Sequence, residues 1–146
     1  MEAPPTLVLD TNAWLDLLVF RDPLLDGLAG AVDDATLRLA TDPRALAELA
    51  RVLRYDALRL DEVCAAAHLA EAVRLAHTID VPSMQLPRCP DADDQMFLEI
   101  AVAARATALV TRDAALLGMS RRMGRDYGFA IIEPAGWRSA LAPDVR

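Results

Sequence analysis

The amino-acid sequence predicts an α/β protein of three layers, with helices on both faces of a central parallel sheet of four to five strands. Short apolar runs alternate with longer segments of helical periodicity, which is the order expected of strand–helix–strand units. The apolar runs are also continuous rather than alternating, as in strands that are buried on both faces. With 146 residues, we expect a single domain over residues 1–146, large enough to bury a substantial core.

Four segments are expected to form strands. Residues 6–10 read Thr-Leu-Val-Leu-Asp and residues 36–40 read Thr-Leu-Arg-Leu-Ala. Residues 107–111 are predicted to form the third strand and residues 129–133 the fourth. Each is a short and mostly apolar run, which favours a buried strand over a helix.

Helices are expected between these strands. The clearest start is at residues 41–43, where a capping residue is followed by a proline suited to the first helical position. That helix is predicted to run to about Arg54. The other predicted helices cover residues 12–20, 60–77, 91–105, 114–119 and 134–141, and one more begins near Leu24. Residues 81–90 contain three prolines and predict a loop or a short edge segment.

The basic residues exclude several mechanisms. All fifteen are arginine and none is lysine, so a P-loop or a Schiff-base enzyme lacks its essential side chain. Arginine remains well suited to binding phosphate in a bidentate manner. The net charge of −7 and the pI of about 4.7 are unusual for a nucleic-acid-binding protein. The acidic excess either is ordinary solubility charge or comes in part from a cluster that bound metal would neutralise.

The length of the apolar segments indicates where in the cell the protein is expected. No apolar run approaches the roughly 20 residues that a membrane helix needs, and the first residues lack the pattern of a signal peptide. We therefore expect a soluble, cytoplasmic protein without a membrane partner. Cys64 and Cys89 form no C-x-x-C pair, so each is interpreted as an unreactive thiol.

Four acidic positions are the main candidates for chemistry: Asp10, Glu48, Asp94 and Asp113. Asp10 ends the first predicted strand, and Asp113 follows the third by two residues. Carboxylates at the ends of buried strands are costly unless a cation lies nearby. Magnesium and manganese prefer oxygen ligands and can activate water for attack on a phosphodiester. Whether the four converge depends on the topology.

Each of these acids also has a purely structural interpretation. Asp10 can be a plain strand-end cap, and Asp113 can cap a short helix of residues 114–119. Glu48 can be an ordinary surface glutamate of its helix. The acids among residues 91–94 can serve only to favour the helix macrodipole.

The motifs resemble those of the PIN-domain family of metal-dependent ribonucleases, and in particular its subgroup of toxins from toxin–antitoxin systems. The resemblance rests on four segments in the right order, which are residues 7–12, 46–53, 91–99 and 109–113. It extends from about residue 6 to residue 133.

The resemblance implies that Asp10, Glu48, Asp94 and Asp113 converge on Mg²⁺ or Mn²⁺. It also implies supporting or substrate-positioning roles for Thr11, Asn12 and Thr111. Among the acids of residues 91–94, Asp94 is favoured as the ligand because an apolar inward-facing residue follows it. Asp93 is its main competitor, and Asp91 is expected to assist.

The function expected from the resemblance is endonucleolytic hydrolysis of RNA, with an antitoxin protein as a candidate partner. A homodimer is also expected, through apolar surface on residues 14–20 or 60–77. The alternative is a non-catalytic RNA- or protein-binding module on the same fold. A haloacid-dehalogenase-type phosphatase is disfavoured because position 12 is Asn12, and a dinucleotide-binding domain because residues 10–20 contain no glycine.

Three further features carry weaker interpretations. His68 and His77 are expected on one long helix at a spacing that is poor for sharing a metal. The basic run of residues 121–125 is either an RNA contact or ordinary surface. Trp14 and Phe20 are expected to be core or partner-facing residues, although either ring is able to stack on a base.

Overall fold

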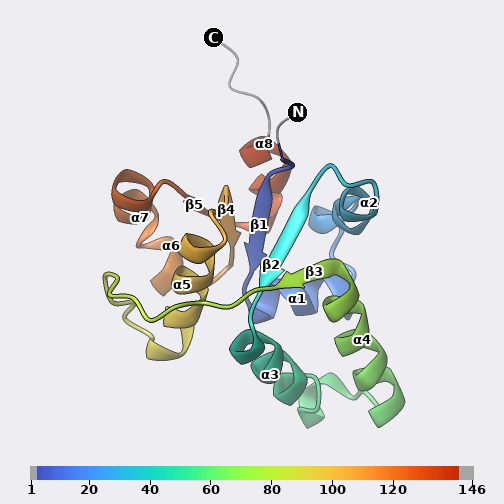
Figure 1. Cartoon of the computed structure of the whole chain (residues 1–146). Helices are drawn as coiled ribbons and strands as arrows, with labels where there is room; N and C mark the ends of the chain where they lie inside the picture. Colours follow the sequence, from blue (N-terminus) through green and yellow to red (C-terminus); the bar gives the residue numbers. More distant parts are fainter. Residues whose placement is uncertain (1–2, 142–146) are drawn as a thin grey trace.

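A computed structural model describes residues 3–141 and contains a five-stranded parallel sheet in the order β3-β2-β1-β4-β5 (Figure 1). The strands are β1 (Thr6–Leu9), β2 (Arg38–Thr41), β3 (Ala76–Thr78), β4 (Ala108–Val110) and β5 (Ala130–Ile132). All four neighbouring pairs are parallel. The predicted three-layer α/β architecture is therefore confirmed.

Eight α-helices connect and flank these strands in the described residues. They are α1 (Thr11–Leu18), α2 (Leu28–Asp33), α3 (Pro43–Val52), α4 (Glu62–Leu75), α5 (Gln95–Ala103), α6 (Ala114–Leu117), α7 (Ser120–Tyr127) and α8 (Trp137–Leu141). Short 3₁₀ turns at Pro23–Leu25, Asp56–Leu58, Ala92–Asp94 and Pro134–Gly136 lead into or link them.

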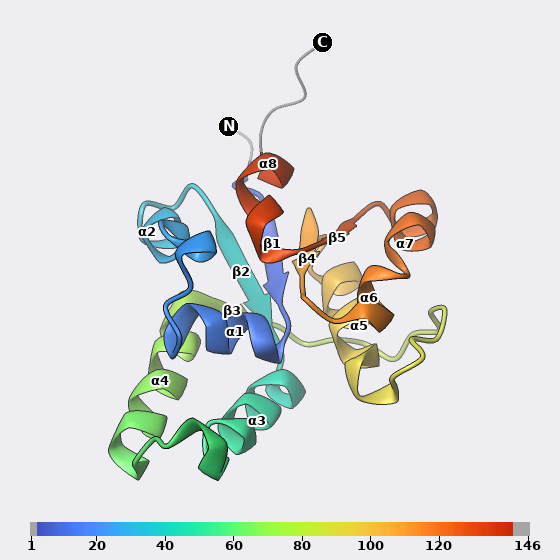
Figure 2. The same ribbon diagram turned by 180° about the vertical axis from the view of Figure 1, so that it is seen from behind.

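The sheet has two separate cores because successive strand residues point to opposite faces. Leu7 and Leu9 of β1 join the larger core, which includes buried side chains from α1 to α4 and α8. Val8 joins the other core, which is built mainly from α5, α6 and α7. Figures 1 and 2 view the sheet from opposite sides, and α1 and α8 lie in front of it in Figure 2.

The strand order places a topological switch between β1 and β4. The chain builds β1, β2 and β3 in one direction and then returns to add β4 and β5 on the other side of β1. Leu9 is paired with Val110, so the two strands end side by side. Ligands of open α/β sheets bind beyond the carboxyl ends of strands at such a switch.

Two sequence predictions need correction. The helix predicted over residues 60–77 ends at Leu75, and the next three residues form β3, the edge strand beside β2. His77 therefore lies on a strand and not on the helix of His68. A strand of three residues after an alanine-rich helix leaves too short a pattern to recognise. Helix α7 was also not predicted, because its residues were interpreted only as a basic run.

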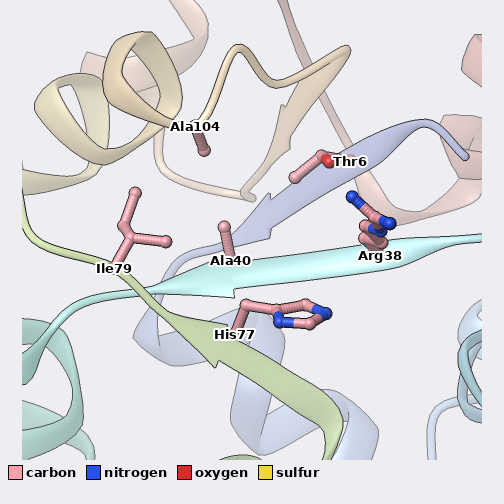
Figure 3. Close-up of a pocket in the computed structure, with 6 residues that line it drawn as sticks. All are labelled: Thr6, Arg38, Ala40, His77, Ile79 and Ala104. Carbon is pink, nitrogen blue, oxygen red and sulfur yellow. The ribbon is translucent and has the colours of Figure 1, made fainter. Parts of the chain in front are cut away.

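A small cavity lies on the sheet face beside β3 and has a volume of about 240 Å³. Its lining side chains are Thr6, Arg38, Ala40, His77, Ile79 and Ala104 (Figure 3). None of these is acidic, so the cavity has no part in the predicted carboxylate site. Within residues 3–141, no helix is both long and apolar enough to cross a membrane.

The fold predicts a large cost for opening a cavity at the centre of the sheet. Leu39 of β2 is fully buried in the larger core, so Leu39→Ala should lower the free energy of unfolding by about 2–5 kcal/mol. Urea denaturation measures this cost. Val63→Ala is the control, because Val63 is 78% exposed on α4 and should change stability by less than about 0.5 kcal/mol. Equal effects of the two substitutions would contradict the burial of Leu39 between the sheet and its helices.

Candidate active site

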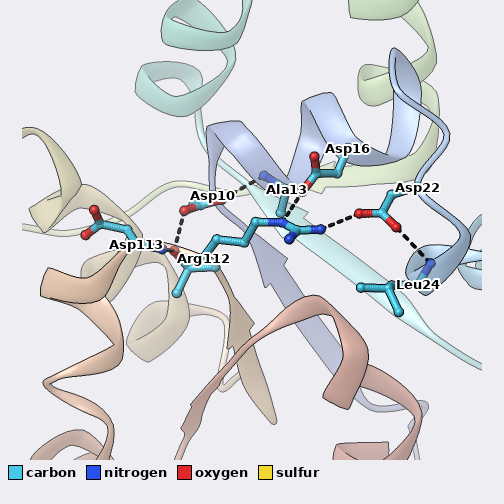
Figure 4. Close-up of polar contacts among 8 residues, drawn as sticks. Asp10, Ala13, Asp16, Asp22, Leu24, Arg112 and Asp113 are labelled. Atoms are coloured by element: carbon cyan, nitrogen blue, oxygen red, sulfur yellow. Dashed lines mark hydrogen bonds and ion pairs between the residues drawn. The ribbon is translucent and has the colours of Figure 1, made fainter.

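Asp10 is a buried carboxylate at the end of β1, with only 3% of its surface exposed. One carboxylate oxygen, Oδ1, accepts the backbone N–H of Ala13 at 2.8 Å and so caps α1. The other, Oδ2, accepts the hydroxyl of Thr111 at 2.5 Å. Asp10 is therefore the cap of α1, and it is also bonded to the neighbouring strand end (Figure 4).

Thr111 connects the two strand ends that meet at the switch. Its hydroxyl donates to Asp10, and the same oxygen accepts the backbone N–H of Asp113 at 2.9 Å. Asp113 in turn caps α6, with its carboxylate accepting the N–H of Leu116 at 3.1 Å. This chain of hydrogen bonds fixes Asp10 and Asp113 relative to each other.

Asp94 approaches the same place from the turn before α5. Burial, a side-chain hydrogen bond with Asp113 and the negative charges of Asp113, Asp91 and Asp10 raise the pKa of Asp94 to about 7. These effects require the carboxyl groups to be close neighbours. The topology thus brings Asp10, Asp94 and Asp113 together, although they are far apart in the sequence.

The electrostatics of Asp10 follow from its burial. Loss of solvation raises the pKa of Asp10 to about 6, although the hydrogen bonds from Thr111 and Ala13 partly oppose this shift. The charges of Asp113 and Asp16 raise it further. Burial and like charges both disfavour an ionised carboxylate, so this group of acids favours a cation as its neighbour.

Glu48 lies on α3, opposite the first turn of α1. Its carboxylate accepts a hydrogen bond from the hydroxyl of Thr11 and lies 3.5 Å from the guanidinium of Arg51. Helix α3 is fixed at its start by the buried Asp42, which accepts the N–H of Ala45 at 2.9 Å. Thr11 follows Asp10 directly, so its bond connects Glu48 to the strand-end acids.

A cleft of about 470 Å³ lies beside these groups. Its lining contains Thr11, Asn12, Leu15, Phe20, Glu48, Val52, Tyr55, Ala57, Leu58, Asp91, Asp93 and Asp94. The cleft therefore joins α1, α3 and the turn before α5, and four of its residues are acidic. Asp10 and Asp113 do not line the cleft and instead follow the ends of β1 and β4.

The competing acids of residues 91–94 have different surroundings. Asp91 accepts the N–H of Asp93 at 3.0 Å and so caps the 3₁₀ turn. Asp93 is exposed, whereas Asp94 is half-buried and close to Asp113 and Asp10. This placement favours Asp94 over Asp93 as the partner of the strand-end acids.

Comparison with family models gives one match, described as a PIN domain, over residues 6–115. The chain belongs to the PIN-domain family. PIN domains are generally nucleases and typically depend on divalent metals. Comparison with curated proteins gave no match.

The carboxylates of this PIN domain do not form a preassembled metal cage. Within residues 3–141, no three side chains of Asp, Glu, His or Cys are arranged to hold an ion by themselves. An all-oxygen site of this kind nevertheless fits Mg²⁺, which keeps several waters and takes only one or two carboxylates. The raised pKa values of Asp10 and Asp94 also fit a cation at this position, because a positive charge would offset the repulsion between the carboxylates.

Sequence reasoning missed two residues that position the site of this PIN domain. Gln95 is buried; its side-chain amide donates to the carbonyl of Pro87 at 3.1 Å, and its side-chain oxygen accepts the N–H of Cys89 at 2.7 Å. These bonds hold the preceding loop against the start of α5, and so orient Asp94. A polar residue at the start of an otherwise apolar helix is the only sequence signal for this role.

Arg112 is the second missed residue. Its guanidinium is 2.8 Å from Asp16 of α1 and is also paired with Asp22 (Figure 4). These ion pairs connect the segment between Thr111 and Asp113 to α1. Asp16 and Asp22 carried no signal in the sequence, because the contact joins residues about ninety positions apart.

Phe20 lines the acidic cleft, but the other sequence candidates do not. Trp14 is buried in the core. The basic run of residues 121–125 lies on α7, which packs against β5, and Arg125 is paired with Asp126 at 2.9 Å. Neither this run nor His68 or His77 lines the acidic cleft.

The hydrogen bond from Thr111 to Asp10 predicts a loss of stability in Thr111→Val. The substitution keeps the shape but leaves a buried carboxylate oxygen without its donor, which should cost about 1–3 kcal/mol. Thr36→Val is the matched control, because the Thr36 hydroxyl donates to Ala31 on the exposed surface and should cost under about 0.5 kcal/mol. Urea denaturation compares the two, and equal costs would show that the Thr111 bond contributes little.

Repulsion among the acids predicts that Asp94→Asn stabilises the metal-free protein at neutral and alkaline pH. The pKa of Asp94 in the folded state, about 7, lies above the usual 3.8. The contribution of this carboxyl group to the stability of the fold is therefore fully present below about pH 4 and is lost as the pH rises through 7. The variant should therefore match the wild type near pH 4. Near pH 8 the free energy of unfolding of the variant should be higher than that of the wild type by the order of 1 kcal/mol, after allowance for solvent screening.

This difference is measured by urea denaturation in EDTA at the two pH values. Asp93→Asn is the control, because it removes one charge from the exposed neighbouring position and leaves Asp94 in place. A wild type as stable as Asp94→Asn near pH 8 would contradict the repulsion.

Proposed function

We propose that this PIN domain is a metal-dependent endoribonuclease that hydrolyses phosphodiester bonds of RNA. The observation that supports this most is the meeting of Asp10, Asp94 and Asp113 at the switch between β1 and β4. Glu48 lies across the adjacent cleft and is connected to them through Thr11. Clustered carboxylates that raise one another's pKa values are a feature of functional sites.

In this proposal Asp10, Asp94, Asp113 and Glu48 hold Mg²⁺ or Mn²⁺, and Glu48 also orients the attacking water. The bound metal would polarise the phosphodiester and lower the pKa of water. Thr111 fixes the carboxylate of Asp10, and Thr11 fixes that of Glu48. Such hydrogen bonds to ligands orient them and tune their basicity.

Three further residues complete the proposed site. Asn12 lines the cleft beside Thr11 and is exposed, which suits contact with substrate. Asp91 holds the turn that presents Asp94, and Asp93 lines the cleft. We assign these three to positioning and not to the chemical step.

We further propose that the protein is the cytoplasmic toxin of a toxin–antitoxin pair, with an antitoxin protein as partner and a homodimer as the functional form. The motif resemblance supports the toxin assignment. For the dimer, Val63 and Val73 are more than half exposed on α4, which supports residues 60–77 as the contact surface. Residues 14–20 are less suitable, because Trp14, Leu15 and Leu18 are buried in the core.

The alternative function is a non-catalytic module that binds RNA or protein. One observation favours it: the acids of the described chain are not arranged to hold a metal through three side chains. A direct test of cleavage and of metal binding separates this alternative from the nuclease.

The proposed function predicts Mn²⁺-dependent cleavage of a labelled single-stranded RNA, lost in Asp10→Asn and in EDTA. The substitution removes a buried charge at nearly constant shape, so the fold should persist. Changing residues that only support metal ligands costs 10- to 100-fold, so changing this proposed ligand should cost at least about a hundredfold. Gel analysis of the products with time measures the rate.

Metal binding provides the second arm of this test. Because Mn²⁺ should bind the folded state alone, it should raise the melting temperature of the wild type and much less that of Asp10→Asn. Asp126→Asn is the control, because this exposed carboxylate lies on α7 and does not line the cleft, and it should keep both cleavage and the thermal shift. An Asp10→Asn protein that still cleaves with Mn²⁺ would contradict the assignment, and a wild type that neither cleaves nor responds to metal would favour the binding module.

A further inference from the structure

The aromatic side chains of the protein divide sharply between core and surface. Of the seven aromatic residues, four are buried, namely Trp14, Phe97, Phe129 and Trp137. The exposed ones are Phe20, Tyr55 and Tyr127, at 58%, 48% and 40%. Phe20 and Tyr55 both line the acidic cleft, although they come from different parts of the chain.

The backbone presents these two rings from ordered turns. The N–H of Phe20 bonds to the carbonyl of Leu15 at 3.0 Å, just after α1 ends. The N–H of Tyr55 bonds to the carbonyl of Val52 at 3.0 Å, just after α3 ends. Both rings are thus held at the ends of the two helices whose earlier residues carry the site.

The lining of the cleft changes from polar to apolar along both helices. On α1, Thr11 is followed one turn later by Leu15, and Phe20 comes after the helix. On α3, Glu48 is followed one turn later by Val52, and Tyr55 comes after the helix. One turn advances about 5.4 Å along a helix axis, so an apolar, ring-bearing surface adjoins the acids within the same cleft.

The charge of the cleft limits what can bind there. Four of its lining residues are acidic, and among the described residues none of its lining side chains is an arginine. A phosphate backbone therefore finds no positive partner in the cleft itself, and attraction of phosphate is the usual source of RNA affinity. Stacking on an aromatic ring needs no such charge, because every base has a π-face.

We propose that Phe20 and Tyr55 form a stacking subsite for unpaired bases next to the phosphodiester held at the acids. This inference rests on the proposed ribonuclease function and adds its recognition element. Paired bases are already stacked within a duplex, so the subsite selects single-stranded RNA. An apolar segment of a partner protein is the competing occupant, and unchanged RNA affinity in a variant without the two rings would favour it.

The test uses a fluorescein-labelled 12-nucleotide RNA without self-complementarity and the full chain. Binding is followed by anisotropy with Ca²⁺, which also takes oxygen ligands, and cleavage is followed separately with Mn²⁺. The variants are Phe20→Leu, Tyr55→Leu and the double variant, because leucine keeps apolar bulk and removes the ring. Tyr127→Leu is the control, since its ring is similarly exposed but does not line the cleft.

Each ring removed from the cleft should lower RNA affinity at least about fivefold, from the usual strength of stacking, whereas Tyr127→Leu should stay within about twofold. A second RNA with abasic nucleotides around the cleavage position identifies the group that is bound. The wild type should bind this abasic RNA more weakly than the intact RNA, whereas the double variant should bind the two RNAs with similar affinity. Melting temperatures close to that of the wild type verify that the variants are folded.

The possible failures are distinguishable. RNA that binds and is cleaved equally well by the double variant overturns the subsite and leaves the nuclease intact. Equal losses on intact and abasic RNA also overturn it, because the rings then do not contact bases. A wild type that neither binds nor cleaves RNA overturns the proposed function and the subsite with it.

Discussion

The buried carboxylate of Asp10 is the constraint on which the rest of the site depends. It ends the central strand, caps α1 with one oxygen and accepts the hydroxyl of Thr111 with the other. Those two bonds fix the starting point of α1 and the position of β4, and so determine where Thr11 and Asp113 lie. The hydrogen bonds compensate only part of the cost of burial, and the pKa of Asp10 stays raised at about 6. The same carboxylate therefore organises the fold and stores an electrostatic cost at the switch point.

This cost is best understood as a compromise between stability and function. A protein selected for stability alone would place an uncharged cap at the end of β1 and would keep Asp94 away from Asp113. Here the like charges gather where the strands end, and the surrounding structure holds them there through Thr111, Gln95 and the loop before α5. Active sites commonly carry such strain, because groups arranged for a charged ligand repel one another without it.

Much of this arrangement could be predicted from the sequence, because local patterns encode it. Apolar runs identified four strands, and acids at two strand ends indicated Asp10 and Asp113. The sequence pattern failed where the determining contact is long-range or the element is very short. Strand β3 has three residues and exists only because it pairs with β2. The ion pairs of Arg112 with Asp16 and Asp22 join segments that are distant in the sequence, so no local sequence pattern predicts them.

The acidic composition is the feature that most constrains how this chain would recognise the RNA of its proposed function. With a net charge of −7 and a cleft lined by carboxylates, long-range attraction of phosphate cannot provide the affinity. Two short-range sources remain in the cleft: a divalent cation at the acids, and stacking on the rings of Phe20 and Tyr55. The first would engage one phosphate and the second its neighbouring bases. Recognition of this kind depends on the local geometry of the RNA strand, and the charge of the RNA backbone alone adds little affinity. This favours an enzyme that is selective for its RNA over one that degrades RNA in general.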